Sequence, residues 1–224
     1  MRIFLSAGLA ALALGCAPPP PPPPAPPVDA LGLALRLEAS GQLLEPVRIL
    51  FDWRLSERDG RFRGRGVARV EPPYKARLEL FLPNGESALR AALVNDDLRL
   101  PGGAPDRLAP PPEMLWGTLG VFRPSRSATL ERGESLTDGR AALLYRLPGG
   151  IGLRYVVGDG GVHVVERLSG GRVVERLAVQ PEAGGRFPSE ATYRNVTAFR
   201  ELTLTRREVT SVELYPPDIW EVVP

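Results

Sequence analysis

The chain has 224 residues, with 28 Lys or Arg and 26 Asp or Glu, and its net charge at pH 7 is +2. A charge this close to zero does not indicate nucleic-acid binding. Cys16 is the only cysteine and His163 the only histidine, which excludes disulfides within the chain and zinc sites built from Cys and His. With 25 prolines and 24 glycines, the composition disfavours a mainly helical fold.

The N-terminal stretch has the pattern of a secretory signal. Arg2 supplies a positive charge, a short apolar run rich in Leu and Ala extends to Leu14, and Gly15 precedes Cys16. The apolar run is too short to span a bilayer. A cysteine at the cleavage point resembles bacterial lipoprotein signal peptides, which are cut before that cysteine, after which the cysteine is acylated. We expect a signal peptide over 1–15 and lipidation of Cys16; the alternative is an unmodified cysteine after an ordinary signal peptide.

Residues 16–32 are expected to form a tether between the acylated cysteine and the folded domain. The segment is almost pure proline from Pro18 to Pro27. Such a run adopts extended polyproline II, in which ten residues reach roughly 30 Å. A ligand for a proline-recognition module is the alternative. Ala17 follows the cysteine, and because an aspartate there marks inner-membrane retention in enterobacterial lipoproteins, we expect outer-membrane placement with the domain facing the periplasm.

The stretch from Val28 to Leu44 fits either a strand or a short helix followed by a strand. From Val47 onward, apolar and polar residues alternate with period two, which predicts half-buried strands. Turn signals separate them, and Asn84-Gly85 is the strongest. We expect a meander of strands at about 47–55, 62–70, 75–82, 89–93 and 98–100.

Gly64, Gly66 and Ala68 share one face of the second of these strands. Small residues there predict bending of the strand or the close approach of a bulky group. The opposite face carries Arg63, Arg65 and Arg69. A solvated face is one interpretation, and contact with anionic headgroups is the other.

A short helix from Glu113 to Phe122 is expected between two blocks of strands, because proline and an acidic residue favour a helix start. The second block has strands at about 140–147, 151–157, 162–168, 173–179, 191–194, 201–207 and 209–214. Glycine-rich hairpin signals separate the first four of these. About ten or eleven strands in one domain over 33–224 should curl into a barrel or fold as a sandwich.

The sequence offers little that suggests catalysis. His163 lies among apolar neighbours and is interpreted as a strand residue at the sheet surface. Asp96-Asp97 reads as a turn, and the acids Glu131, Glu134 and Asp138 as solvated loop residues. No glycine-rich loop precedes a helix with a lysine, so a phosphate cradle of that type is unsupported. We therefore expect no enzyme and no cofactor.

Three features together resemble the bacterial lipoprotein-localisation family, the LolA/LolB-like carriers and receptors. These are the strand–proline–strand meander from Gly66 to Gly85, the short helix after Pro112, and the late pair Arg186-Phe187-Pro188 and Leu202-Thr203-Leu204. The resemblance implies a mainly β fold, a single antiparallel sheet curled into a half-open barrel. It also implies one or two short helices that plug its concave face over a cavity for acyl chains. One departure is the polar turn Pro83-Asn84-Gly85-Glu86, where the receptors carry an apolar tip.

The expected function is an envelope lipoprotein that binds acyl chains or lipidated proteins, contributes to lipoprotein or lipid transport to the outer membrane, and catalyses nothing. We expect a monomer, anchored to the membrane by its N-terminal lipid. The alternative is a structural or assembly lipoprotein that binds protein partners through a sheet edge or surface patch, without lipid cargo. The candidate cavity residues are Ile49, Phe51, Trp53, Leu78, Leu80, Leu82, Leu115, Leu119 and Phe122.

Overall fold

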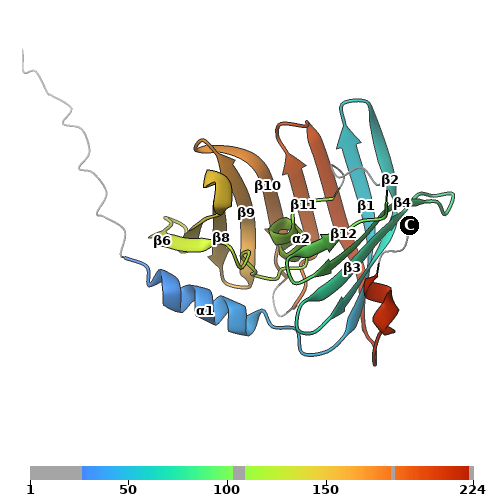
Figure 1. Ribbon diagram of the computed structural model, residues 1–224, viewed down its shortest axis with the longest axis horizontal. Helices are drawn as coiled ribbons and strands as arrows, with labels where there is room; N and C mark the ends of the chain where they lie inside the picture. The colour runs from blue at the N-terminus through green and yellow to red at the C-terminus, as the bar shows by residue number, and fades with distance from the viewer. Residues whose placement is uncertain (1–26, 103–108, 183–184, 222–224) are drawn as a thin grey trace, which may run out of the picture.

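The computed structural model describes residues 27–102, 109–182 and 185–221. The expected signal peptide, Cys16 and most of the expected tether therefore lie outside the described residues. The described part of the chain is built around one curled antiparallel sheet, with short helices against it (Figure 1).

The sheet has twelve strands in the order β5-β4-β3-β2-β1-β12-β11-β10-β9-β8-β7-β6. Because β5 and β6 are not paired with each other, the sheet forms a half-open barrel, which confirms the expected fold class. The strands are β1 (Val47–Glu57), β2 (Gly60–Glu71), β3 (Lys75–Phe81), β4 (Ser87–Val94), β5 (Asp97–Arg99), β6 (Thr129–Ser135), β7 (Ala141–Arg146), β8 (Gly152–Gly158), β9 (Gly161–Ser169), β10 (Arg172–Gln180), β11 (Glu190–Asn195) and β12 (Arg200–Ser211).

Two differences from the expected strands have a physical reason. The strand β6 has Leu130 as its single large apolar residue, so its sequence reads as a solvated loop, and Glu131 and Glu134 lie on it as edge residues. The expected strands at 201–207 and 209–214 are one continuous strand, β12. A bulge sets Leu50 opposite Glu208 and Phe51 opposite Arg206, so Arg207 is the extra residue that breaks the alternation.

The glycines of β2 make room for two large side chains of β1. Phe51 lies opposite Gly66, and Trp53 lies opposite Gly64. A Cβ on Gly66 would lie 2.2 Å from the Phe51 ring, and one on Gly64 would lie 1.9 Å from the Phe81 carbonyl oxygen. The predicted close approach of a bulky group at this strand is thus confirmed, and it lets aromatic rings fill the concave face.

Helix α1 (Ala30–Ser40) resolves the ambiguity of the N-terminal stretch in favour of a helix. The Asp29 side chain caps it by accepting a hydrogen bond from the Gly32 N–H at 3.0 Å. The helix begins inside the segment expected as tether, and it packs against the edge strand β6. Leu31 and Leu35 remain exposed on its outer side, while Ala34 is buried.

Helix α2 (Pro112–Thr118) lies inside the curve of the sheet and packs on β9, β10 and β11 (Figure 1). It ends four residues before the expected Phe122, because the chain turns at Gly120, which has a positive φ of 72°. A Cβ on Gly117 would lie 2.5 Å from a methyl carbon of Leu177, so glycine there lets the helix approach β10. Two short 3₁₀ turns, η1 (Pro148–Gly150) and η2 (Pro217–Trp220), complete the described elements.

Candidate functional site

An apolar cavity of about 300 Å³ lies on the concave face, at the end of the half-barrel that carries the β1–β2 and β3–β4 turns. Trp53 and Leu55 of β1 and Leu202 of β12 form one side. The other side comes from β2, β3 and β4, and one charged residue, from β1, stands at the rim. The lining residues are Trp53, Leu55, Glu57, Phe62, Leu80, Leu82, Ala88, Leu89 and Leu202.

The floor of this cavity is buried and its rim is accessible. Trp53, Leu80, Leu89 and Leu202 are buried, whereas Phe62 is 49% exposed. The Trp53 indole N–H donates to the carbonyl oxygens of Arg65 and Phe81, at 3.1 and 3.2 Å, which fixes the ring. A volume of 300 Å³ is at the lower end of the range for small-molecule pockets, about 300–1,000 Å³. The cavity thus has the size and polarity to hold an alkyl chain.

No family model matches the sequence, and no curated protein matches it. Solved structures do match. A LolA-superfamily protein from Nitrosomonas europaea has a TM-score of 0.57 at 12% identity, over 85% of this chain and 97% of that one.

This chain has a LolA-like fold. A putative outer membrane lipoprotein-sorting protein domain from Vibrio parahaemolyticus has a TM-score of 0.51 at 9% identity, over 84% of this chain and 95% of that one. A DUF1329 family protein from Desulfovibrio piger has a TM-score of 0.50 at 8% identity, over 86% and 95%. Identities this low show the fold and not the ligand.

In this LolA-like sheet the expected cavity residues divide into three groups. Trp53, Leu80 and Leu82 line the 300 Å³ cavity. Voids of only about 20 and 30 Å³ remain at the centre of the concave face, because α2 fills it. Spaces of this size are about a tenth or less of the volume of small-molecule pockets, so they cannot hold an alkyl chain. The expected residues around these voids are Ile49, Phe51, Leu78, Leu115 and Leu119.

Phe122, the ninth expected residue, belongs to an aromatic cluster beyond the helix. Its ring centroid lies 4.8 Å from that of Tyr155 in an edge-on arrangement and 6.4 Å from that of Tyr145. Sequence reasoning missed Leu55, Phe62, Ala88, Leu89 and Leu202 as cavity residues. Leu55 follows Trp53 on the same face of β1, so the alternation of the sequence indicates that it faces the cavity. Leu202 lies beside these two residues only because β1 pairs with β12.

Helix α2 is held as a plug by a buried ionic cluster at its N-terminal end. Glu113 lies 3.1 Å from the Arg167 guanidinium of β9, which also donates to Glu175 of β10 at 2.7 Å. Glu175 further accepts hydrogen bonds from Tyr193 and Asn195. Burial raises the pKa of the Glu113 carboxyl above its usual range, although Arg167 opposes the shift.

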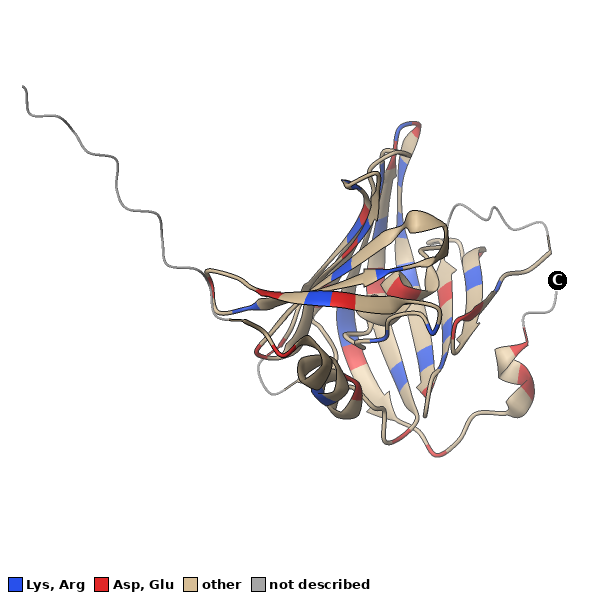
Figure 2. Ribbon diagram, turned by 60° about the vertical axis from the view of Figure 1, so that its left-hand side comes forward, with Lys and Arg blue, Asp and Glu red and all other residues tan. Residues whose placement is uncertain are grey.

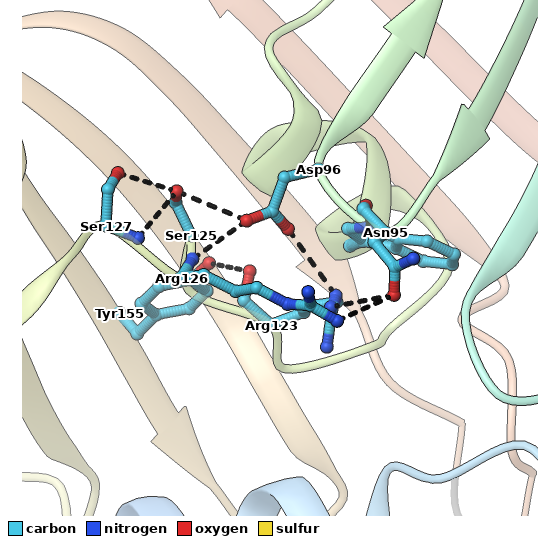
Figure 3. Close-up of polar contacts among 8 residues, drawn as sticks. Asn95, Asp96, Arg123, Ser125, Arg126, Ser127 and Tyr155 are labelled. Atoms are coloured by element: carbon cyan, nitrogen blue, oxygen red, sulfur yellow. Dashed lines mark hydrogen bonds and ion pairs between the residues drawn. The ribbon is translucent and has the colours of Figure 1, made fainter.

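A second polar cluster holds the chain that follows α2 (Figure 3). The Trp116 indole N–H donates to the Asn95 carbonyl oxygen at 2.8 Å, and the Asp96 carboxylate accepts from the backbone N–H of Arg126 at 2.8 Å. Arg123 lies near Asp96 and over the Tyr74 ring, 3.6 Å from its centroid. Every residue of α2 from Glu113 to Thr118 is buried. The arrangement is that of a plug packed into the concave face.

The arginines of β2 differ in their partners. Arg69 pairs with Glu79, which also binds Arg77 at 3.0 Å. Arg63 and Arg65 are exposed and have no ion pair with any described residue. Within the described ranges, no three His, Cys, Asp or Glu side chains gather where they could hold a metal ion. The helices seen in these ranges are also too short or too polar to cross a membrane.

His163 lies on β9 at the sheet surface, as expected, with its Nε2 atom 3.2 Å from the Asp159 carbonyl oxygen. Asp96 lies in the β4–β5 turn, as expected, while Asp97 begins β5.

Proposed function

We propose that this protein is a lipid-anchored envelope protein that holds an acyl chain in the apolar cavity of its half-open barrel. The observation that carries the proposal is the cavity of about 300 Å³ at the open end of the sheet, lined almost entirely by apolar side chains. Filling it with an alkyl chain removes apolar surface from water on both partners, at about 25 cal/mol per Å². The role is binding and transport, not catalysis.

The LolA-like fold, which this chain shares with a putative outer membrane lipoprotein-sorting protein domain from Vibrio parahaemolyticus, supports this class of function. Lipidation of Cys16 would place the protein at a membrane surface, where lipids and lipoproteins are available for binding. We propose the outer membrane as that surface, in keeping with Ala17 after the cysteine, and we propose a monomer as the working form.

The two edges of the sheet favour lipid binding over strand addition by a protein partner. Strand β5 has three residues, and β6 carries Glu131, Arg132 and Glu134. Short strands and charged side chains are features by which sheet edges resist pairing with another chain. Among the described residues that line the cavity, in contrast, only Glu57 is charged.

The cavity can be filled from within to test the proposal. Ala88 is half-buried in the lining, so Ala88→Phe places a phenyl ring where the alkyl chain would lie. We expect the affinity for N-phenylnaphthylamine, a neutral apolar probe whose fluorescence rises on binding, to fall about tenfold or more because the site is occupied. The matched control is Ala39→Phe, which adds the same ring at an exposed position of α1.

Circular dichroism and thermal melting establish that both variants are folded. Equal probe binding by folded Ala88→Phe, folded Ala39→Phe and the wild type would contradict the assignment of this cavity as the binding site.

A further inference from the structure

A surface notch of about 1030 Å³ lies where β12, β1 and β2 meet the β3–β4 turn. Five arginines line it. Arg206 pairs with Glu182, and the other four, Arg54, Arg63, Arg65 and Arg207, are exposed. Asp52 is the one acidic residue among the described residues that line it, and the Arg207 Nε atom already donates to its carboxylate at 2.6 Å. Arg54, Arg63 and Arg65 form no ion pair with any residue in the described ranges. The notch therefore carries a local excess of positive charge. Figure 2 shows how Lys and Arg positions recur along the strands of the sheet.

The notch exists because β2 and β3 separate. Their pairing ends at Arg65 opposite Phe81, while β2 remains paired with β1 as far as Gly60 (Figure 1). At the point of separation the Trp53 indole N–H binds the carbonyl oxygens of Arg65 and Phe81. Gly64 bears no side chain that could fill the space beside Phe81.

The notch and the apolar cavity adjoin. Trp53 and Leu82 line both of them, with the cavity on the concave side and the arginines on the opposite face of the sheet. An amphiphile could therefore place its chain against Trp53 and Leu82 and its polar end among the arginines. Neither the position of the chain nor that of the polar end requires a change in the strand pairing.

The arrangement of the arginines lowers the stability of the sheet when no ligand is bound. Arg54 and Arg63 lie directly opposite each other on paired strands. Like charges in this position destabilise a sheet. A bound anion would offset that repulsion, and guanidinium groups bind phosphate through two parallel N–H···O hydrogen bonds.

We infer that the notch and the cavity together form one site for a phosphate-bearing amphiphile, whose chain fills the cavity and whose phosphate binds Arg63 and Arg65. The inference rests on the proposed function and names the class of ligand. We expect the phosphate to bind as part of the amphiphile and not as a free ion, because Trp53 and Leu82 line both the notch and the cavity.

The test compares dodecyl phosphate with dodecyl maltoside, which has the same chain and a neutral headgroup, each below its micelle concentration. Both are measured by displacement of N-phenylnaphthylamine from the full chain. For the wild type we expect dodecyl phosphate to displace the probe at a concentration about tenfold lower, because only it forms charge-assisted hydrogen bonds. Inorganic phosphate alone should not displace the probe.

The double variant Arg63→Gln/Arg65→Gln should lose the preference for dodecyl phosphate and keep the affinity for dodecyl maltoside. Its melting temperature should stay unchanged or rise, because the repulsion with Arg54 is removed. The matched control Arg36→Gln/Arg90→Gln removes two other exposed arginines, which have no ion pair with described residues, and should keep the preference.

Equal displacement by the two amphiphiles in the wild type would overturn the inference and leave the proposed function intact. An undiminished preference in Arg63→Gln/Arg65→Gln would overturn it as well, as would displacement of the probe by inorganic phosphate. If the probe did not bind the wild type at all, both the inference and the proposed function would fail.

Discussion

At the scale of single residues, the most consequential positions are those where a side chain is missing. Gly64 and Gly66 let Trp53 and Phe51 cross the concave face, and Gly64 also marks the point where β2 leaves β3. The same absence of a Cβ thus shapes the cavity floor and opens the notch. Glycine inside a strand normally lowers stability, so its presence here indicates close packing.

We expect Gly64→Ala to destabilise the protein strongly, by about 2 kcal/mol or more, because overpacking forces backbone shifts. The new Cβ would lie 1.9 Å from the Phe81 carbonyl oxygen, which is backbone and cannot rotate away. Urea denaturation measures the effect. Gly102→Ala is the control, since nothing lies within 4 Å of its Cβ position. Equal midpoints for the two variants would show that β2 and β3 can move apart freely.

At the scale of elements, α2 is too short to be stable by itself and depends on its surroundings. Its two ends are fixed differently. Glu113 joins it to β9 and β10 through Arg167, and Trp116 joins it to the β4–β5 turn through Asn95. The helix therefore links strands from both blocks of the sheet across its concave face.

The buried Glu113 carboxyl should make stability depend on pH. Its pKa in the folded state lies above the ordinary value of 4.5 because burial disfavours the charged form. Between these two pKa values the folded state binds more protons than the unfolded state, so this residue makes stability fall as the pH rises through that window. Because glutamine does not titrate, we expect Glu113→Gln to lack this contribution to the pH dependence of stability.

Urea midpoints of the wild type and Glu113→Gln at about pH 4.5 and about pH 7 measure the difference. The wild type should lose more stability between the two values than the variant does, whatever the other carboxyls contribute to both. Parallel changes in the two proteins would show that the Glu113 proton is not coupled to folding.

At the scale of the whole molecule, the concave face is divided between a filled centre and an open end. Leu119 lies at the end of α2 beside the two small voids, while Leu82 lies at the rim of the large cavity. The sequence places both in one acyl-chain cavity. In the structure they belong to different regions, so their substitutions should have different effects.

We expect Leu119→Asp to lower the melting temperature, because a carboxylate would enter the packed centre, while the folded fraction keeps its affinity for N-phenylnaphthylamine. Leu82→Asp, at a half-buried rim position, should weaken probe binding about tenfold with a smaller change in melting temperature. Thermal melting and fluorescence titration of both variants provide the comparison. Loss of binding in folded Leu119→Asp would instead place the site beneath α2.

The sequence by itself determined the local structure. Alternation in β1 and glycine turns such as Asp159-Gly160-Gly161 specify strands and hairpins, because strand faces and turn conformations depend on neighbouring residues. It also indicated the close approach at Gly64 and Gly66. Strand β6 was missed because an edge strand needs no apolar face of its own.

The tertiary structure alone decided where the open space lies. Which apolar residues face a void and which face α2 depends on the end of α2 at Thr118 and on the anchoring of that helix by Arg167 and Asn95. These contacts join residues far apart in the chain, so the local periodicity of the sequence does not predict them. The same holds for the notch, which arises where paired strands separate and so brings arginines of β1, β2 and β12 beside an apolar cavity.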